Sequence, residues 1–325
     1  MTPLPALPLV PDASGRPHLI IDNSTIEKLR CPRLLEYEWL RRRVLVANKA
    51  GRNFGSTLHV GWAVRYQLRG NRAVDSGTVI AQNLAMATWL DANPQPTGDF
   101  RNLDHACRVM EAYNKTYGIE DFSILKNAEG KPCVESSFLF PLGEVDGLLI
   151  DYCGKIDLGI ERDGGLFSFD HKTTFQFGKT WERQLQMDGG QLGYCWAIGK
   201  LLGRQPAGYI IDGVRIRKPK RSDEYSDIAP IDASDFVRMP VMVSAEDLDS
   251  WQANTLALVR VILTHHRNGI FPMHRWNCTN KFGECDMIEV CSCPESNRAE
   301  ILASTAFEDN TWSPLEKPEN KGKTE

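Results

Sequence analysis

The sequence lacks several features that would assign it to a large class of proteins. Its 325 residues contain no apolar run long enough to span a bilayer, so a membrane protein is not expected. No Gly-x-x-x-x-Gly-Lys segment is present, which excludes a fused P-loop ATPase or helicase in this chain. No secretory signal is recognisable either, and a cytoplasmic protein is therefore expected.

Charge and cysteine content exclude two further classes. The nine cysteines are an odd number, and a chain of this length can bury a core without covalent staples, so a disulfide scaffold is not expected. The net charge is −4, so no overall basic excess indicates nucleic-acid binding. Contacts to a phosphate backbone need only a local basic surface, however, and such binding remains compatible with this composition.

The segment Lys155–Thr174 (KIDLGIERDGGLFSFDHKTT) predicts two strands joined by a tight turn. Asp163 and Gly164 favour a two-residue turn, because both of its central positions need positive φ. This register pairs residues of like charge across the two strands: Asp157 with Asp170, and Lys155 with Lys172. A three-residue loop that includes Gly165 would shift the register by one residue.

Strand alternation gives this hairpin one charged face and one apolar face. The apolar face is formed by Ile156, Leu158, Ile160, Phe167 and Phe169. Opposed carboxylates with Cβ atoms about 4.5–5.5 Å apart repel each other, so a cation between Asp157 and Asp170 is expected. Oxygen ligands suit Mg²⁺ or Mn²⁺, and Lys172 would orient a water or stabilise charge on a phosphate. A surface hairpin with a polar face is the alternative.

Two segments outside the hairpin extend this pattern. Gly55-Ser-Thr-Leu-His59 opens a predicted helix before it, and Gln191-Leu-Gly-Tyr194 lies in a predicted helix after it. This ordered set, spread over about residues 24–294, resembles the RecB-like branch of the PD-(D/E)XK nuclease superfamily. The resemblance implies an α/β fold with a mixed central sheet flanked by helices. The usual Gln-x-x-x-Tyr is Gln-x-x-Tyr here, which affects the role of Tyr194 more than that of Gln191.

The resemblance also implies a role for each matched residue. Three are implied as ligands of Mg²⁺ or Mn²⁺: His59, Asp157 and Asp170. Lys172 is implied as the catalytic lysine, Gln191 as a residue that supports the site or contacts DNA, and Tyr194 as a DNA contact. The ring of His171 points to the opposite face, but its backbone carbonyl could bind the metal. Without the other motifs, His59, Gln191 and Tyr194 would be interpreted as ordinary helix residues.

The cysteines give a second, independent signal. Cys278, Cys285 and Cys291 lie close together in the sequence, and Cys31 lies near its beginning. Four thiolates select iron–sulfur or zinc, and the absence of a Cys-x-x-Cys knuckle favours iron–sulfur. One early cysteine followed by a late triplet resembles the iron–sulfur RecB-like nucleases, which include CRISPR spacer-acquisition exonucleases, AddB subunits and phage-encoded relatives.

That second resemblance implies a structural [4Fe–4S] cluster that joins the N- and C-terminal segments. Cys293 is the alternative to Cys31 as the fourth ligand. The remaining cysteines are interpreted as small buried apolar residues: Cys107, Cys133, Cys153 and Cys195.

Basic residues cluster after the hairpin, where a predicted strand ends in a polar loop. Four of them are predicted to contact DNA phosphates: Arg217, Lys218, Lys220 and Arg221. Arg41-Arg42-Arg43 forms a second cluster, which fits DNA contact and ordinary solvated charge equally well.

Periodicity and capping signals predict the remaining elements. The predicted helices are Thr25–Val44 with a Ser24 cap, Ser56–Gln67, Thr78–Leu90, Leu103–Thr116, Gln186–Leu202 and a helix from a Ser244–Asp247 cap to Asn268. The predicted strands outside the hairpin are Val134–Phe140, Tyr209–Arg217 and Phe236–Val243. We expect a single nuclease domain over residues 18–305, made of a helical insert (about 56–133), a catalytic core (134–243) and a long helix with the cysteine segment (244–294). Residues 1–17 and 306–325 are expected to be disordered.

Together these features predict a metal-dependent deoxyribonuclease, an exonuclease acting on single strands or ends. DNA is the expected partner, and a homo-oligomer or recombination or CRISPR partner proteins are compatible with the resemblance. The alternative is a non-catalytic DNA-binding or assembly protein on the same fold, acting in recombination or replication. A third interpretation makes the cysteine segment a zinc module of an unrelated α/β enzyme.

Overall fold

The computed structural model describes residues 4–12, 14–46, 50–219, 230–280 and 283–310. It divides into two compact units. The first unit takes its residues from Met1–Ala47, Ser137–Gly154 and Asp249–Glu325, and the second from Asn48–Ser136 and Lys155–Leu248. Strands β5 (Val134–Val145) and β6 (Leu148–Arg162) and helix α8 (Ala245–Asn268) contribute residues to both units.

The second unit is built on a mixed sheet in the order β6-β7-β8-β9. Strand β7 (Gly165–Thr174) is antiparallel to β6 and parallel to β8 (Gly208–Arg215). Strand β9 (Phe236–Met242) is antiparallel to β8, and the short β4 (Ser123–Ile124) pairs with β6. The predicted α/β fold with a mixed sheet is therefore confirmed.

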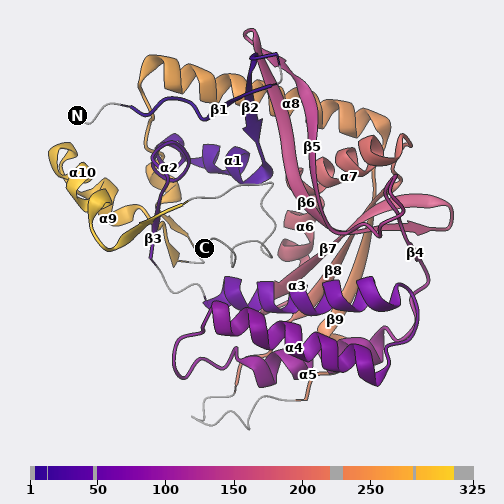
Figure 1. Cartoon of the computed structure of the whole chain (residues 1–325). Helices are drawn as coiled ribbons and strands as arrows, with labels where there is room; N and C mark the ends of the chain where they lie inside the picture. The colour runs from indigo at the N-terminus through magenta and orange to yellow at the C-terminus, as the bar shows by residue number, and fades with distance from the viewer. Residues whose placement is uncertain (1–3, 13, 47–49, 220–229, 281–282, 311–325) are drawn as a thin grey trace. The chain divides into compact units, whose positions relative to one another are not determined.

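Helices cover both faces of this sheet. Helices α3 (Ala50–Arg69), α4 (Ser76–Ala92) and α5 (Leu103–Thr116) lie side by side (Figure 1) and pack on the face that carries Phe169. Helix α7 (Gly189–Leu202) packs on the other face, where Ser168 Oγ of β7 lies 3.4 Å from Cys195 Sγ. The shorter α6 (Lys179–Gln186) precedes α7. Helix α5 has the predicted bounds, whereas α3 begins at Ala50, so Gly55–His59 lies inside a helix and does not open it.

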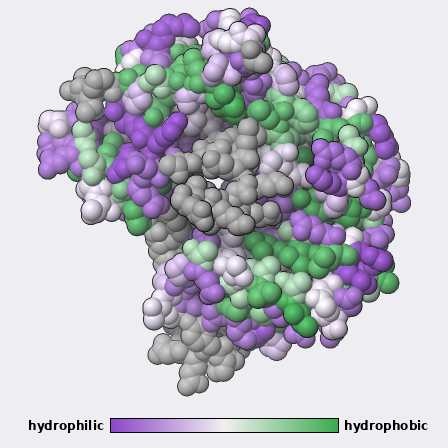
Figure 2. Space-filling view, in the orientation of Figure 1, coloured by the Kyte–Doolittle hydropathy of each residue, from purple (hydrophilic) through white to green (hydrophobic). Residues whose placement is uncertain are grey.

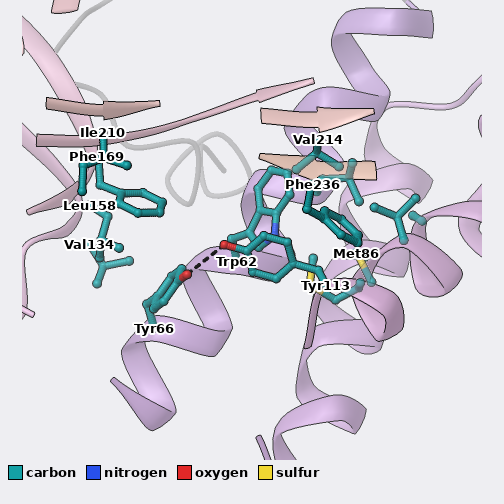
Figure 3. Packing of buried hydrophobic residues seen from close by; sticks show 14 of the residues in the cluster. Trp62, Tyr66, Met86, Tyr113, Val134, Leu158, Phe169, Ile210, Val214 and Phe236 are labelled. Carbon is teal, nitrogen blue, oxygen red and sulfur yellow. Dashed lines mark hydrogen bonds between the residues drawn. The ribbon is translucent and has the colours of Figure 1, made fainter. Parts of the chain in front are cut away.

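Aromatic side chains fill the core between the sheet and these helices. Figure 3 shows Trp62, Tyr66 and Tyr113 on the helices and Phe169 and Phe236 on the strands, with a hydrogen bond of 2.9 Å between the hydroxyls of Tyr66 and Tyr113. The apolar face predicted for the hairpin lies buried, with Leu158, Ile160, Phe167 and Phe169 in this core and Ile156 also buried. On the outer side, α4 exposes Val79, Ile80 and Leu84, and Figure 2 shows apolar surface over α3 and α4.

The first unit contains strands β1 and β2, the first residues of β6 and most of the long helix α8. Strand β1 (Leu9–Pro11) is antiparallel to β2 (Pro17–Ile21), which runs parallel to the first residues of β6. The predicted start of α8 is confirmed, because the Ser244 amide and hydroxyl both donate to Asp247 Oδ2, at 2.8 and 2.7 Å. Gly269, with φ of 65°, ends the helix as predicted.

The predicted helix Thr25–Val44 is wrong, because the chain breaks there into short turns. Helix α1 (Asn23–Glu27) is capped by Asp22, not Ser24, and α2 (Pro32–Leu35) follows a 3₁₀ turn at Lys28–Arg30. Cys31 is extended, with φ of −145°, since the residue before a proline is disfavoured in the helical region. A π-helical turn, Glu36–Leu40, then leads to strand β3 (Arg43–Leu45).

The C-terminal part of the first unit consists of short elements. Its elements after α8 are a 3₁₀ turn at Arg275–Asn277, β10 (Thr279–Asn280), β11 (Gly283–Glu284), α9 (Ile288–Ser292), α10 (Glu295–Ala303) and β12 (Phe307–Asp309). Strand β12 pairs with β3, and β10 pairs with β11. Strands β1 and β12 thus fall in segments predicted to be disordered, while residues 311–325 lie outside the described residues.

Candidate active site

The turn of the β6–β7 hairpin has the predicted two-residue form. Asp163 and Gly164 have φ of 51° and 77°, and the ladder runs from Arg162↔Gly165 to Leu158↔Phe169. The ladder ends at Leu158↔Phe169, so the predicted pairing of Asp157 with Asp170 lies one step beyond its last pair and stays a prediction. The backbone N–H of His171 donates to Asp157 Oδ2 at 3.0 Å, which fixes the orientation of that carboxylate.

One face of β7 carries charged side chains, and the other face packs into the core. Asp170 and Lys172 lie on the charged face, whereas the His171 ring is buried on the opposite side, as predicted. That ring stacks on Trp62 with centroids 4.2 Å apart, and its Nδ1 lies 2.7 Å from Asp212 Oδ2 of β8. The ring of His171 is therefore a core element and does not reach the carboxylates of the charged face.

One group of side chains in the second unit lies close enough together to hold a metal ion. The ligand atoms of His59, Glu135 and Asp157 all lie within 4.8 Å of one another. Nδ1 of His59 is 3.3 Å from Asp157 Oδ2 and 3.7 Å from Glu135 Oε1. The predicted ligands His59 and Asp157 thus meet, joined by a residue that the sequence motifs did not include.

Glu135 was missed although it lies in a segment predicted as a strand. It is the second residue of β5, with φ of 49°, a backbone conformation that few residues other than glycine adopt. Its carboxylate also forms an ion pair with Lys155, which the predicted register had placed opposite Lys172. An acidic residue at the start of a strand near the hairpin was the available signal, but it is too common to be specific.

Asp170 lies outside this group of three and is paired with the lysine two residues later. Lys172 Nζ is 2.8 Å from Asp170 Oδ2, and the lysine side chain remains 37% exposed while Asp170 is buried. The motif Asp-x-Lys therefore forms an internal ion pair, and the lysine side chain is half-buried.

The charges of this site shift one another's pKa values strongly. Burial disfavours the charged form of Asp157, but His59, His171 and Lys172 outweigh it and lower its pKa. Burial, reinforced by the charge of Asp157, raises the pKa of Asp170. Burial acts to lower the pKa of Lys172, but the two aspartates outweigh it and the net shift is upward, so the amine stays protonated near neutral pH.

The protonation of His59 makes the expected metal affinity depend on pH. Burial lowers its pKa, but Asp157 and Glu135 outweigh burial and raise it to about 10. A metal ion needs the neutral imidazole, so its binding to His59 displaces a proton at any pH below that value. We expect Mn²⁺ affinity to rise about tenfold per pH unit from pH 6 to 9, measured by calorimetry, because one proton is released. A histidine with an ordinary pKa of about 6.5 would instead give affinity that levels off above pH 7, which would contradict the assignment. His59→Gln is the matched variant without proton release.

The helix motif lies at the start of α7. Its N-cap Asp188 accepts from the Gly190 amide at 2.8 Å and contributes to the raised pKa of Lys172. Gln191 is buried, and its side-chain oxygen has no hydrogen-bond partner among the described residues. Tyr194 lies one turn further along the same helix. The structure thus brings the beginning of α7 near Lys172.

The basic residues predicted to contact DNA differ in whether a carboxylate already pairs with them. Arg217 donates from Nε to both oxygens of Asp235, each at 2.8 Å, and its Nη2 pairs with Asp232 at 3.1 Å. Its charge is therefore neutralised within the second unit, which weakens its predicted role. Lys218 is exposed, and Lys220 and Arg221 lie outside the described residues. In the other basic cluster, Arg41 pairs with Glu36 and Arg43 with Asp309.

In the first unit, the four cysteines predicted as cluster ligands line one pocket: Cys31, Cys278, Cys285 and Cys291. The β10–β11 pair brings Cys278 and Cys285 together, with a hydrogen bond of 2.8 Å from the Cys285 amide to the Cys278 carbonyl. The extended Cys31 accepts a hydrogen bond at its sulfur from the His274 amide at 3.5 Å. Cys293 does not line this pocket, and its thiol donates to the Glu289 carbonyl at 2.8 Å.

Burial and the neighbouring thiols shift the pKa of Cys291, but the four sulfur atoms are not tightly grouped. Burial, followed by the neighbouring cysteines, raises the pKa of Cys291 to about 11. Among the described residues, no three of these sulfur atoms lie within 4.8 Å of one another. All nine cysteines are free thiols.

Comparisons with known proteins give only distant likenesses. No protein-family model and no curated protein matches the chain. It is similar to a crystal structure from Eubacterium rectale described as “Putative exonuclease”, with 12% identity over 84% of this chain and 94% of that one and a TM-score of 0.46. A second similar structure, that of SSO0001, has 12% identity over 74% of this chain and 84% of that one and a TM-score of 0.33. At these values neither likeness supports a conclusion about fold or function, and membership of the RecB-like branch stays a prediction.

Within the described ranges, no helix combines the length and apolar character that crossing a membrane requires.

Proposed function

We propose that this protein is a metal-dependent deoxyribonuclease that hydrolyses phosphodiester bonds in single strands or at DNA ends. The observation that supports this most directly is the meeting of His59, Glu135 and Asp157 beside the Asp170–Lys172 pair, all within the second unit. Carboxylates, an imidazole and a protonated amine at one place are the groups that metal-assisted phosphodiester hydrolysis uses.

The residues present fit a divalent ion. Two carboxylates and one imidazole are a donor set suited to Mn²⁺ or Mg²⁺. Positive side chains balance the acidic ones in this arrangement, with Lys155 on Glu135, Lys172 on Asp170 and His59 between Asp157 and Glu135. A bound ion would take over the balancing charge of His59. The carbonyl of His171 and the Asp170 carboxylate are proposed as further ligands.

When bound, the ion would polarise the scissile phosphate and stabilise the departing oxygen. Lys172, kept protonated by Asp170 and Asp157, would donate hydrogen bonds to the attacking water and to the negative charge that develops on the phosphate. Its protonated state makes it a stabiliser of charge and a poor general base. The His171 amide holds Asp157 in the orientation that faces His59. Gln191 is proposed as a support of this site and Tyr194 as a DNA contact.

We further propose that Cys31, Cys278, Cys285 and Cys291 hold a structural [4Fe–4S] cluster. They share one pocket, and the amide hydrogen bond to Cys31 is of the kind that stabilises cluster thiolates. Ligands of one tetrahedral zinc ion at 2.3 Å would all lie roughly 3.8 Å apart, whereas no three of these sulfur atoms lie within 4.8 Å of one another. The cluster would supply bonds between distant parts of the chain.

An end-labelled digest with anaerobically prepared protein tests the proposed activity. Single- and double-stranded DNA, labelled at the 5′ or the 3′ end, should be shortened with Mn²⁺ or Mg²⁺ and remain intact with EDTA. Intact DNA under every condition would rule out the nuclease, and binding without cleavage would support a non-catalytic DNA-binding protein.

A further inference from the structure

An exposed aromatic ring and an exposed cation meet at one edge of the sheet in the second unit. Phe175 follows the last residue of β7 and is 46% exposed. Lys218 lies shortly after the end of β8, and its ammonium stands 4.1 Å from the centroid of the Phe175 ring. No carboxylate of the described residues lies within 4.0 Å of that ammonium.

Neighbouring groups of the same kinds are already engaged. Arg215 donates to Asp235 at 2.7 Å, and Arg217 is held by the same carboxylate. The rings of Phe177 and Trp181 pack together, with centroids 5.2 Å apart, over Gly213 of β8, where a Cβ atom would collide with them. These residues contact one another at the edge of the sheet, whereas the side chains of Phe175 and Lys218 are exposed to solvent there.

The position of this pair relative to the candidate active site follows from strand geometry. Phe175 lies three residues beyond Lys172 and one residue beyond the end of β7, so the two Cα atoms are at most about 11 Å apart. Strands β7 and β8 are parallel, with Lys172 beside Gly213 and Thr174 beside Arg215, so both chains leave the sheet at the same edge. The carboxyl ends of parallel strands are the usual place for ligands in open α/β sheets.

We propose that Phe175 and Lys218 form a nucleotide subsite next to the catalytic groups, which binds one unpaired nucleotide of a single strand. This inference rests on the proposed nuclease function. The base would stack on the Phe175 ring, and Lys218 would pair with the adjoining phosphate. In the free protein the ammonium covers the ring, and a cation over an exposed ring is held weakly enough to move to a phosphate.

The chemistry of the pair selects single strands over duplex. A base inside a duplex has both faces covered by its neighbours, so only an unpaired base offers a face to an aromatic ring. A single exposed lysine adds a contact to the backbone without sequence preference.

Fluorescence anisotropy with a labelled oligo-dT tests this subsite on the full chain, without divalent ions so that no cleavage occurs. Phe175→Ala should weaken binding about tenfold or more, whereas Phe175→Trp should bind as tightly as the wild type. Phe175→Leu keeps an apolar contact but loses the aromatic face, and it should bind as weakly as the alanine variant. Affinity for a blunt duplex should stay unchanged in all three variants.

Salt dependence tests the contribution of Lys218. Lys218→Ala should reduce the slope of log affinity against log salt by about 0.7, the value for one phosphate contact on a single strand. Lys131→Ala is the matched control, because Lys131 is exposed but pairs with Glu129 at 2.8 Å, and its slope should equal that of the wild type. An unchanged slope in Lys218→Ala would remove Lys218 from the subsite.

Different experimental results would contradict the nucleotide subsite and the proposed nuclease function. The subsite is wrong if the wild type degrades DNA and Phe175→Ala binds oligo-dT as tightly as the wild type. The same holds if Phe175→Leu, with a wild-type melting temperature, binds oligo-dT as tightly as the wild type. The proposed nuclease function is not contradicted by either result. If the wild type neither binds nor degrades DNA, both are wrong.

Discussion

Replacing Lys172 with alanine is expected to reduce DNA hydrolysis about 100- to 1,000-fold while DNA affinity stays close to that of the wild type. The reason is the position of its amine, which Asp170 holds at 2.8 Å on a side chain that is only half-buried. A donor fixed before the reaction stabilises the charge that develops on the phosphate and contributes little to binding of the ground state. Single-turnover digestion and anisotropy on the same labelled DNA measure the two quantities separately.

The control for this experiment is an exposed lysine of the second unit. Lys131→Ala removes an equal charge outside the site, where Lys131 pairs with Glu129 alone, and should leave hydrolysis unchanged. Asp157→Asn should also abolish cleavage, since it removes a carboxylate shared by His59 and the His171 amide. Full activity of Lys172→Ala would show that the charged face of the hairpin is not catalytic.

Replacing Cys31 with serine is expected to remove the proposed iron–sulfur cluster, whereas the same change at Cys293 should leave it in place. Cys31 lines the pocket with the other three cysteines, and the Cys293 thiol is bonded to the Glu289 carbonyl outside it. Iron and acid-labile sulfide analysis should give about four of each per chain in the wild type and Cys293→Ser, and little in Cys31→Ser. Visible absorbance should follow the same pattern.

The two cysteine variants also differ in their expected stability. The bond from the cluster to Cys31 would close a loop between Cys31 and the cysteines at residues 278–291. Loss of this bond in Cys31→Ser should lower the melting temperature of the protein. Cys293→Ser should melt as the wild type does. If the protein contains stoichiometric zinc and no iron, the four cysteines form a zinc site and not an iron–sulfur cluster. If Cys293→Ser loses iron and Cys31→Ser keeps it, Cys293 is the fourth ligand.

The hairpin and its two faces were predictable because their causes are local. Positive φ at Asp163 and Gly164 sets the register, and alternation then decides which side chains share a face. The long helix α8 and its Ser244–Asp247 start were predicted for the same reason. The break at Cys31 had a local signal too, in the following proline, which the helical periodicity of the segment obscured.

The contacts that the sequence did not show join segments that lie apart in the chain. Glu135 reaches His59 and Lys155 only because β5 lies close to both α3 and β6, and no short motif records that meeting. Arg217 looked available to DNA because the sequence does not show that Asp235, from the following turn and buried, neutralises it. The roles of these residues stay predictions.

The two-residue turn between β6 and β7 has a consequence for how the chain can change over evolutionary time. One inserted residue there would rotate every later side chain of β7 to the other face of the sheet. The Lys172 amine would then point into the aromatic core, and the imidazole of residue 171 would leave its stacked place on Trp62. A change in the length of this turn that shifts the register of β7 is therefore disfavoured, whereas residues that tolerate positive φ can replace one another there.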